Sequence, residues 1–178
     1  MSAYGCQAMS ARLSRVIMRR PGKSLMAAKA DEWHYGPMFN AEKAIGQHAS
    51  FAHLVEKSGA EIIWIEDEGD GLADAMFTHD PSLVTDQGAV ILRMGKKLRV
   101  AEGDLHEAAY NRAGVPILGR IEAPGTVEGG DCVWVDSKTL AVGRGVRTNQ
   151  AGIDQLQKIL APLGVTVYGF DLPLWQGE

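Results

Sequence analysis

The same order of elements recurs along this chain at a nearly constant interval. Three stretches have the capping residues and apolar spacing of helices: 40–58, 102–113 and 149–163. Each helical stretch ends at a glycine that precedes a strand-like run: Gly59, Gly114 and Gly164. These glycines lie 55 and 50 residues apart. A fixed interval of this size is typical of repeated supersecondary units, which stack because none can bury its apolar face alone.

Two segments between these helices also resemble each other. Residues 80–93 and 131–144 each begin with Asp, turn at a polar tip that contains Asp, and end thirteen residues later with Arg. We interpret them as equivalent β-hairpins, each with an acidic residue at its mouth. The chain is therefore predicted to be an α/β protein made of ββαβ repeats, with the hairpin of the third repeat missing after Phe170.

Carboxylates gather at the mouths of these predicted hairpins. Glu128 and Asp131 flank a Gly-Gly pair, and Asp80 opens the first hairpin. If the repeats surround an axis, these three acids face one centre and suit a planar guanidinium, whose forked donors match carboxylates. Arg147 would then pair with the carboxylate of an amino-acid ligand. A hard metal ion, Mg²⁺ or Ca²⁺, is the alternative ligand, but the sequence has no loop with the dense oxygen-ligand spacing that such ions need. For each acid taken alone, the alternative is a solvated residue at the end of a hairpin.

Composition narrows the class of protein. With 178 residues, 46% hydrophobic and 22% charged, the chain can form one domain with a core. A formal net charge of −4 argues against a nucleic-acid or anionic-membrane partner, and no apolar run reaches the length of a membrane span. Only two cysteines occur, Cys6 and Cys132, without metal or redox spacing, so we expect a cytoplasmic protein without metal or cofactor.

Three motifs resemble those of a known family. The segments are Asp74-Ala-Met-Phe-Thr-His-Asp80, Thr126-Val-Glu-Gly-Gly-Asp131 and Val142-Gly-Arg-Gly-Val-Arg-Thr-Asn149. They are similar to the guanidino-group-modifying enzymes, namely dimethylarginine dimethylaminohydrolases, arginine deiminases and amidinotransferases. The resemblance implies a pentein-type α/β propeller of which about three of five repeats are present. We expect residues 1–12 to be a disordered tail and 13–178 to be a partial catalytic domain that lacks its C-terminal part.

The resemblance also implies roles for particular side chains. Asp80 would hold the substrate guanidinium, Phe77 would form a wall of the pocket, and Glu128 would orient and charge-stabilise a catalytic histidine. The remaining substrate-side residues are Asp74, Arg147 and Asp131, of which the last could instead serve the turn.

The chemistry that the resemblance implies is nucleophilic. A cysteine thiolate attacks the guanidinium carbon, a histidine protonates the departing amine, and water resolves the covalent intermediate. We expect both residues to lie beyond Glu178, because Cys132 is better interpreted as a small core residue. The expected function is hydrolysis of a C–N bond in arginine or a substituted arginine, with the chain itself inactive. An amidinotransferase and a non-catalytic binding remnant are the alternatives, and the oligomeric state stays open.

Overall fold

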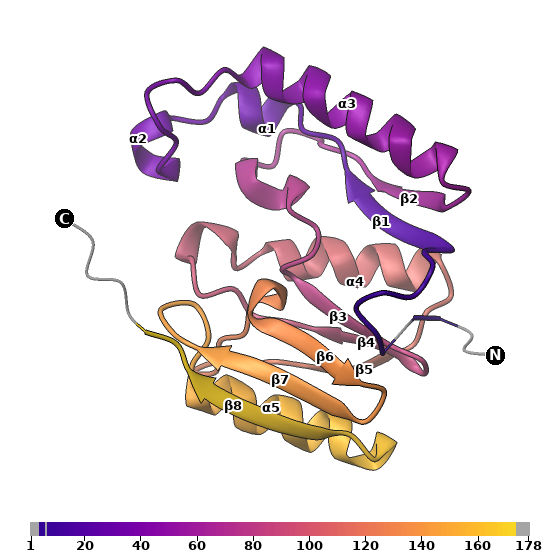
Figure 1. Ribbon diagram of the computed structural model, residues 1–178. Helices are drawn as coiled ribbons and strands as arrows, with labels where there is room; N and C mark the ends of the chain where they lie inside the picture. Colours follow the sequence, from indigo (N-terminus) through magenta and orange to yellow (C-terminus); the bar gives the residue numbers. More distant parts are fainter. Residues whose placement is uncertain (1–3, 6, 174–178) are drawn as a thin grey trace. The chain divides into compact units, whose positions relative to one another are not determined.

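The structure is a computed structural model that describes residues 4–5 and 7–173 (Figure 1). The chain divides into two compact units, one of residues Arg12–Thr78 and one that combines Met1–Ala11 with His79–Glu178. We call them the N-terminal and the C-terminal unit and describe each by itself. Among the described residues, no helix is long and apolar enough to cross a membrane.

The N-terminal unit is built on two parallel strands. Strand β1 (Arg15–Arg19) pairs with β2 (Glu61–Ile65), and helix α3 (Ala41–Lys57) connects them. The predicted caps are confirmed, because the Asn40 side chain accepts a hydrogen bond from the backbone of Lys43 at 2.8 Å and Gly59 has a positive φ of 88°. The shorter elements are α1 (Lys23–Met26), α2 (Ala30–Trp33) and η1 (Ala73–Met76).

The C-terminal unit contains the two predicted ββαβ repeats. The first consists of β3 (Ser82–Thr85), β4 (Gly88–Ile91), α4 (Glu102–Arg112) and β5 (Ile117–Arg120). The second consists of β6 (Cys132–Asp136), β7 (Thr139–Arg144), α5 (Gln150–Leu160) and β8 (Thr166–Asp171). In each repeat an antiparallel hairpin is extended by a parallel third strand, in the orders β3-β4-β5 and β6-β7-β8. Both hairpin predictions are therefore confirmed. The short turns η2 (Lys97–Arg99), η3 (Gly129–Asp131) and η4 (Ala161–Leu163) complete the unit.

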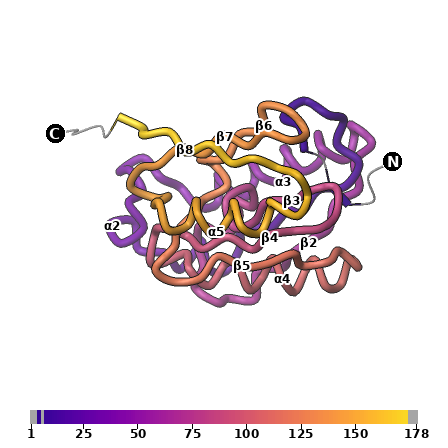
Figure 2. The backbone as a smooth tube through the Cα atoms, turned by 90° about the horizontal axis from the view of Figure 1, so that it is seen from below, coloured from indigo at the N-terminus to yellow at the C-terminus, as the bar shows by residue number. Residues whose placement is uncertain are grey.

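Helix α5 packs against other elements through two of its sides. Ile153, Leu156 and Leu160 are buried in the core with the sheet of their own repeat. The neighbouring side reaches the preceding repeat, where a Cβ added to Gly119 of β5 would lie 2.9 Å from Ile159. Figure 2 shows the backbones of α5 and β5 near each other. One continuous apolar core consequently joins the two repeats.

The start of the chain contributes to the C-terminal unit. Gln7 lies within the expected tail, yet its side chain is buried and donates to the carbonyl of Ser137 at 2.6 Å. The same side chain accepts from the backbone N–H of Asp86 at 3.1 Å, so it bonds to the turns of both hairpins. The division into a tail (1–12) and a partial catalytic domain (13–178) stays a prediction.

Candidate functional site

Asp80 connects the mouths of the two hairpins in the C-terminal unit. It lies two residues before β3, and its Oδ1 accepts from the backbone N–H of Gly130 at 3.2 Å. Its carbonyl accepts from the N–H of Gly129 at 2.9 Å, and its Oδ2 lies 2.8 Å from Nη1 of Arg99. The structure thus brings the first acidic residue of the repeat against the Gly-Gly pair that precedes the second hairpin.

The first glycine of this pair is required by close packing. A Cβ added to Gly129 would lie 2.1 Å from the carbonyl oxygen of His79, which is far inside van der Waals contact. Any other residue would push the turn away from Asp80. The Gly-Gly pair therefore sets the distance between the two acidic hairpin mouths.

Glu128 lies buried beside the same turn. Its Oε1 accepts from the backbone N–H groups of Gly95 and Lys96 at 3.0 and 3.2 Å. The guanidinium of Arg147 donates from Nη1 to Oε1 and Oε2 of Glu128 at 3.2 and 3.3 Å. From the sequence we expected Arg147 to bind a ligand carboxylate, whereas in this structure it pairs with Glu128.

Asp131 is linked to Glu128 through the hydroxyl of Thr148. Thr148 Oγ1 donates to Asp131 Oδ2 at 2.6 Å and accepts from the backbone N–H of Glu128 at 3.1 Å. The predicted residues Asp80, Glu128, Asp131 and Arg147 thus lie in one hydrogen-bonded neighbourhood of the C-terminal unit.

The buried pair Arg99–Glu102 supports Asp80 and was missed by the sequence analysis. Arg99 donates from Nε and Nη2 to the two carboxylate oxygens of Glu102, both at 2.8 Å, and Glu102 is fully buried. Burial alone would lower the pKa of Arg99, but the hydrogen bonds and charges of Glu102 and Asp80 outweigh burial and raise it. An Arg and a Glu three residues apart at the start of a helix were the available signal.

The charges of this neighbourhood do not cancel. The neighbourhood contains four carboxylates and two guanidinium groups, so its formal charge is −2 when all six are ionised. We call this set the acidic cluster; its members are Asp80, Arg99, Glu102, Glu128, Asp131 and Arg147. Such a surplus favours a cationic ligand. Across residues 4–5 and 7–173, no group of three or more His, Cys, Asp or Glu is arranged to hold a metal ion.

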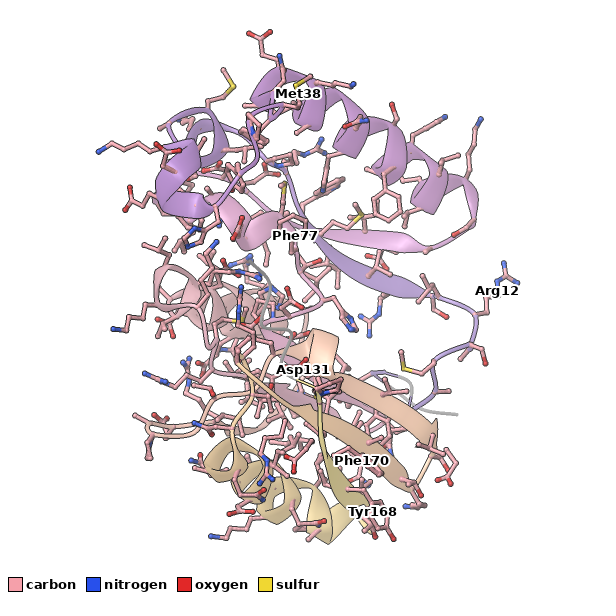
Figure 3. All side chains as sticks on the ribbon, turned by 60° about the vertical axis from the view of Figure 1, so that its left-hand side comes forward. Arg12, Met38, Phe77, Asp131, Tyr168 and Phe170 are labelled. Carbon is pink, nitrogen blue, oxygen red and sulfur yellow. The ribbon has the colours of Figure 1, made fainter. Side chains whose placement is uncertain are left out.

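The other two predicted site residues belong to the N-terminal unit. Asp74 lies in η1, is buried, and accepts a hydrogen bond from the hydroxyl of Tyr35 at 2.8 Å. Phe77 follows η1 directly and is half-exposed (Figure 3). Their contact with a ligand held by the acidic cluster stays a prediction.

Cys132 is the core residue that the sequence indicated. It is buried at the start of β6, and burial, aided by the negative charge of Asp131, raises the pKa of its thiol to about 12. At neutral pH this thiol is therefore protonated and a poor nucleophile. His106 lies in the core with its Nδ1 2.9 Å from Ser82 Oγ, and Ser82 Oγ also lies 2.7 Å from the Tyr110 hydroxyl.

Comparison with known proteins finds relatives whose names describe enzymes that act on guanidino compounds. The family model described as arginine deiminase matches residues 69–164, more than half of the chain. Dimethylarginine dimethylaminohydrolase from Pseudomonas aeruginosa is 32% identical over 85% of this chain and 58% of its own length. The protein of the same name from Streptomyces coelicolor is 35% identical over 70% of this chain and 47% of its own length. The chain thus spans about half the length of these relatives.

Solved structures show the same likeness. The dimethylarginine dimethylaminohydrolase of Pseudomonas aeruginosa, solved in complex with citrulline, superimposes with a TM-score of 0.76 at 28% identity, over 90% of this chain and 62% of the other. This likeness confirms the predicted pentein-type α/β fold. It also agrees with the motif resemblance in residues 74–149.

Proposed function

The chain belongs to the arginine deiminase family, and from this premise we propose that it forms the substrate-holding part of an enzyme that hydrolyses a C–N bond at the guanidinium carbon of arginine or a substituted arginine. The observation that carries the proposal is the acidic cluster. Its surplus of negative charge lies at the Gly-Gly turn of the family-like motif.

Asp80 is the proposed partner of the substrate guanidinium. Its carboxylate is fixed from two sides by Gly130 and Arg99, and Arg99 is fixed in turn by both oxygens of Glu102. A carboxylate held in this way loses little conformational entropy on binding, which favours a bidentate guanidinium. In this proposal Phe77 and Asp74 contribute the wall and a further polar contact.

We propose that Glu128 and Arg147 together orient the catalytic histidine and the substrate. Glu128 would hold and charge-stabilise the catalytic histidine, and Arg147 would turn from Glu128 towards the carboxylate of the amino-acid substrate. The half-exposed side chain of Arg147 and its hydrogen bonds of 3.2 and 3.3 Å to Glu128 support this exchange, because they are longer than those of the buried Arg99. Asp131 fixes the turn through Thr148 and adds negative charge to the substrate side.

The proposed reaction proceeds through a covalent cysteine intermediate. A thiolate attacks the guanidinium carbon, a histidine gives its proton to the departing amine, and water releases the ureido product. Cys132 does not fit the nucleophile, because its thiol is buried and has a raised pKa. We therefore propose that residues outside 1–178 supply the cysteine and the histidine. Water is the favoured acceptor because the named relatives are hydrolases; products formed with added glycine would separate hydrolysis from amidino transfer.

Titration calorimetry with L-arginine and with asymmetric dimethylarginine tests the binding half of this proposal. Asp80→Asn should weaken binding about 10- to 100-fold, the loss expected for one charge-assisted interaction. Asp104→Asn is the matched control, because Asp104 also pairs with an arginine, Arg120, but is exposed and lies outside the acidic cluster. Equal affinities of the two variants would contradict the assignment of Asp80.

The catalytic half is tested by product formation. Citrulline should not form from arginine or methylated arginine when only residues 1–178 are supplied. The control is Cys132→Ala, which removes the buried thiol. Citrulline formation by the unaltered chain above this control would show that our assignment of the nucleophile is wrong.

A further inference from the structure

The hairpins of the two repeats end with equivalent arginines that differ in their partners. Arg144, at the end of β7, donates from Nε to Oδ1 of Asp171 at 2.5 Å and from Nη1 to Gln150 at 2.6 Å. Arg93, two residues after β4, makes a single long hydrogen bond of 3.5 Å, from Nη1 to the carbonyl of Gly125. In the described part of the chain, the arginine of the first repeat thus has no anionic partner like that of its counterpart.

The strand that follows each helix explains this difference. In the second repeat β8 stays in register with β7 through Asp171, the residue opposite the arginine. In the first repeat β5 ends at Arg120, and Glu122, which corresponds to Asp171 by the register of the ladder, lies after the strand. The backbone N–H and carbonyl of Glu122 bond instead to the side chain of Gln155 on α5, at 2.8 and 2.9 Å. The backbone of Glu122 is therefore fixed on α5, and this structure leaves Arg93 open to another anion.

Arg93 lines a cavity of about 390 Å³ between the end of β4, η2, the start of α4 and the end of β5. Arg120 also lines this cavity, but Asp104 and Glu107 of α4 already pair with it. Lys97 lies on η2 and is exposed, and its ammonium has no partner within residues 4–5 and 7–173. We call this cavity the α4 pocket; its lining includes Arg93, Lys97, Leu98, Val100, Arg120 and Glu122. Its volume is sufficient for a small molecule.

The α4 pocket lies outside the acidic cluster and belongs to the first repeat. No described side chain is a member of both, although η2 contributes Lys97 to the pocket and Arg99 to the cluster. The pocket is formed by the first repeat and by the segment that leads to the second. Repeats contact their neighbours along the chain, so repeats after Glu178 would adjoin the second repeat or, in a closed ring, the start of the chain. The pocket thus does not lie where later repeats of the fold would pack.

We propose that the α4 pocket binds a small organic carboxylate between Arg93 and Lys97. The planar guanidinium of Arg93 offers a fork of donors that fits a carboxylate, and the ammonium of Lys97 adds a second positive charge. Leu98 and Val100 are both half-buried and give the apolar body of such a ligand a surface to cover. Glu122 is exposed at the pocket and repels an anion, so its charge lowers the affinity.

A nuclear magnetic resonance titration of the ¹⁵N-labelled chain with butyrate tests this proposal. The backbone signals of Lys97, Leu98 and Val100 should shift saturably, with a dissociation constant on the order of 1 mM for a ligand this small. Butyramide has the same apolar body without the charge and should cause no saturable shift of these signals. Both ligands are added at constant ionic strength, because salt screens exposed charges. Signals that do not move with butyrate, or that move equally with butyramide, would overturn the proposal.

Variants with effects of opposite sign assign the binding to the α4 pocket. Arg93→Gln should weaken butyrate binding about 10-fold, the loss expected for one charge-assisted contact. Glu122→Gln should strengthen binding roughly 2- to 5-fold because it removes a repelling charge, and a loss of folded structure does not produce such a gain. Lys97→Gln, at an exposed position, should also weaken binding and provides the test if Arg93→Gln does not fold.

Arg112→Gln is the matched control for these variants. Arg112 is an exposed arginine at the end of α4 and lies outside the pocket, so this variant should bind butyrate like the unaltered chain. Equal affinities of Arg93→Gln and Arg112→Gln, or weaker binding by Glu122→Gln, would show that the carboxylate does not bind at this pocket.

Discussion

Replacement of Glu102 by Gln tests the buried charges that hold the acidic cluster. Glu102 is fully buried, and its two oxygens each lie 2.8 Å from a nitrogen of Arg99. In Glu102→Gln one oxygen can still accept, but the amide NH₂ then faces a guanidinium N–H, donor against donor. Asp80, whose Oδ2 lies 2.8 Å from Nη1, still pairs with Arg99 in this variant.

The expected loss follows from this geometry. Removal of one partner of a buried ion pair costs about 3–5 kcal/mol because the other charge is left uncompensated. Since Asp80 still neutralises part of the Arg99 charge, we expect the lower end, about 3 kcal/mol. For a chain of this size each kcal/mol lowers the melting temperature by about 2–4 °C, so the expected fall is roughly 6–12 °C.

Urea unfolding followed by circular dichroism measures this loss. The measurement is repeated at two protein concentrations, because any association of the folded chain would add to the apparent stability. The control Asp104→Asn breaks the exposed pair with Arg120 and should cost less than about 1 kcal/mol. A Glu102→Gln loss no larger than that of Asp104→Asn would refute the reasoning that burial makes the Arg99–Glu102 pair costly to break.

Three further predictions concern packing, pH and the thiol. Gly152→Ala should lower the free energy of unfolding in urea by about 2 kcal/mol, because the added Cβ would lie 2.2 Å from a carbonyl oxygen. Gly46→Ala, whose Cβ would have nothing within 4 Å, should raise that free energy by about 0.5–1 kcal/mol. Equal effects of the two substitutions would contradict this prediction. Burial alone would raise the pKa of Asp67, but hydrogen bonds and an arginine charge lower it below 3.8, so unfolding free energy should fall as pH drops below 3.8, and less steeply in Asp67→Asn. In a Cys6→Ala background, Cys132 should react with a thiol reagent at pH 8 only after denaturation, and fast reaction of the folded protein would exclude a buried thiol.

The helices and hairpins were predictable because their signals are local. Asn40 and Asn149 accept hydrogen bonds from the backbone three residues on, and Gly59 and Gly164 adopt positive φ where the helical stretches end. Such caps depend on a few neighbouring residues and can be identified in a sequence. The packing of α5 on two sheets was not predictable, because it depends on which side of the helix meets a distant strand.

The candidate site was predictable in part for the same reason. The repeat placed Asp80 and Asp131 at equivalent hairpin mouths, and in the structure Asp80 accepts a hydrogen bond from the backbone of Gly130, beside Asp131. Glu102 was recognised only as a helix start, since its burial against Arg99 arises from tertiary packing. The pairing of Arg147 with Glu128 likewise depends on a loop geometry that the motif does not encode.

The two-sided packing of α5 determines how this chain can be dissected. A single ββαβ repeat from residues 80 to 121 would leave Leu83 and Val90 in water, because Ile159 and its neighbours supply their cover. Ile153, Leu156 and Leu160, on the other side of α5, would in turn lose the sheet of their own repeat, so a cut between the two repeats exposes apolar side chains on both pieces. Fragments for complementation should therefore keep the two repeats together.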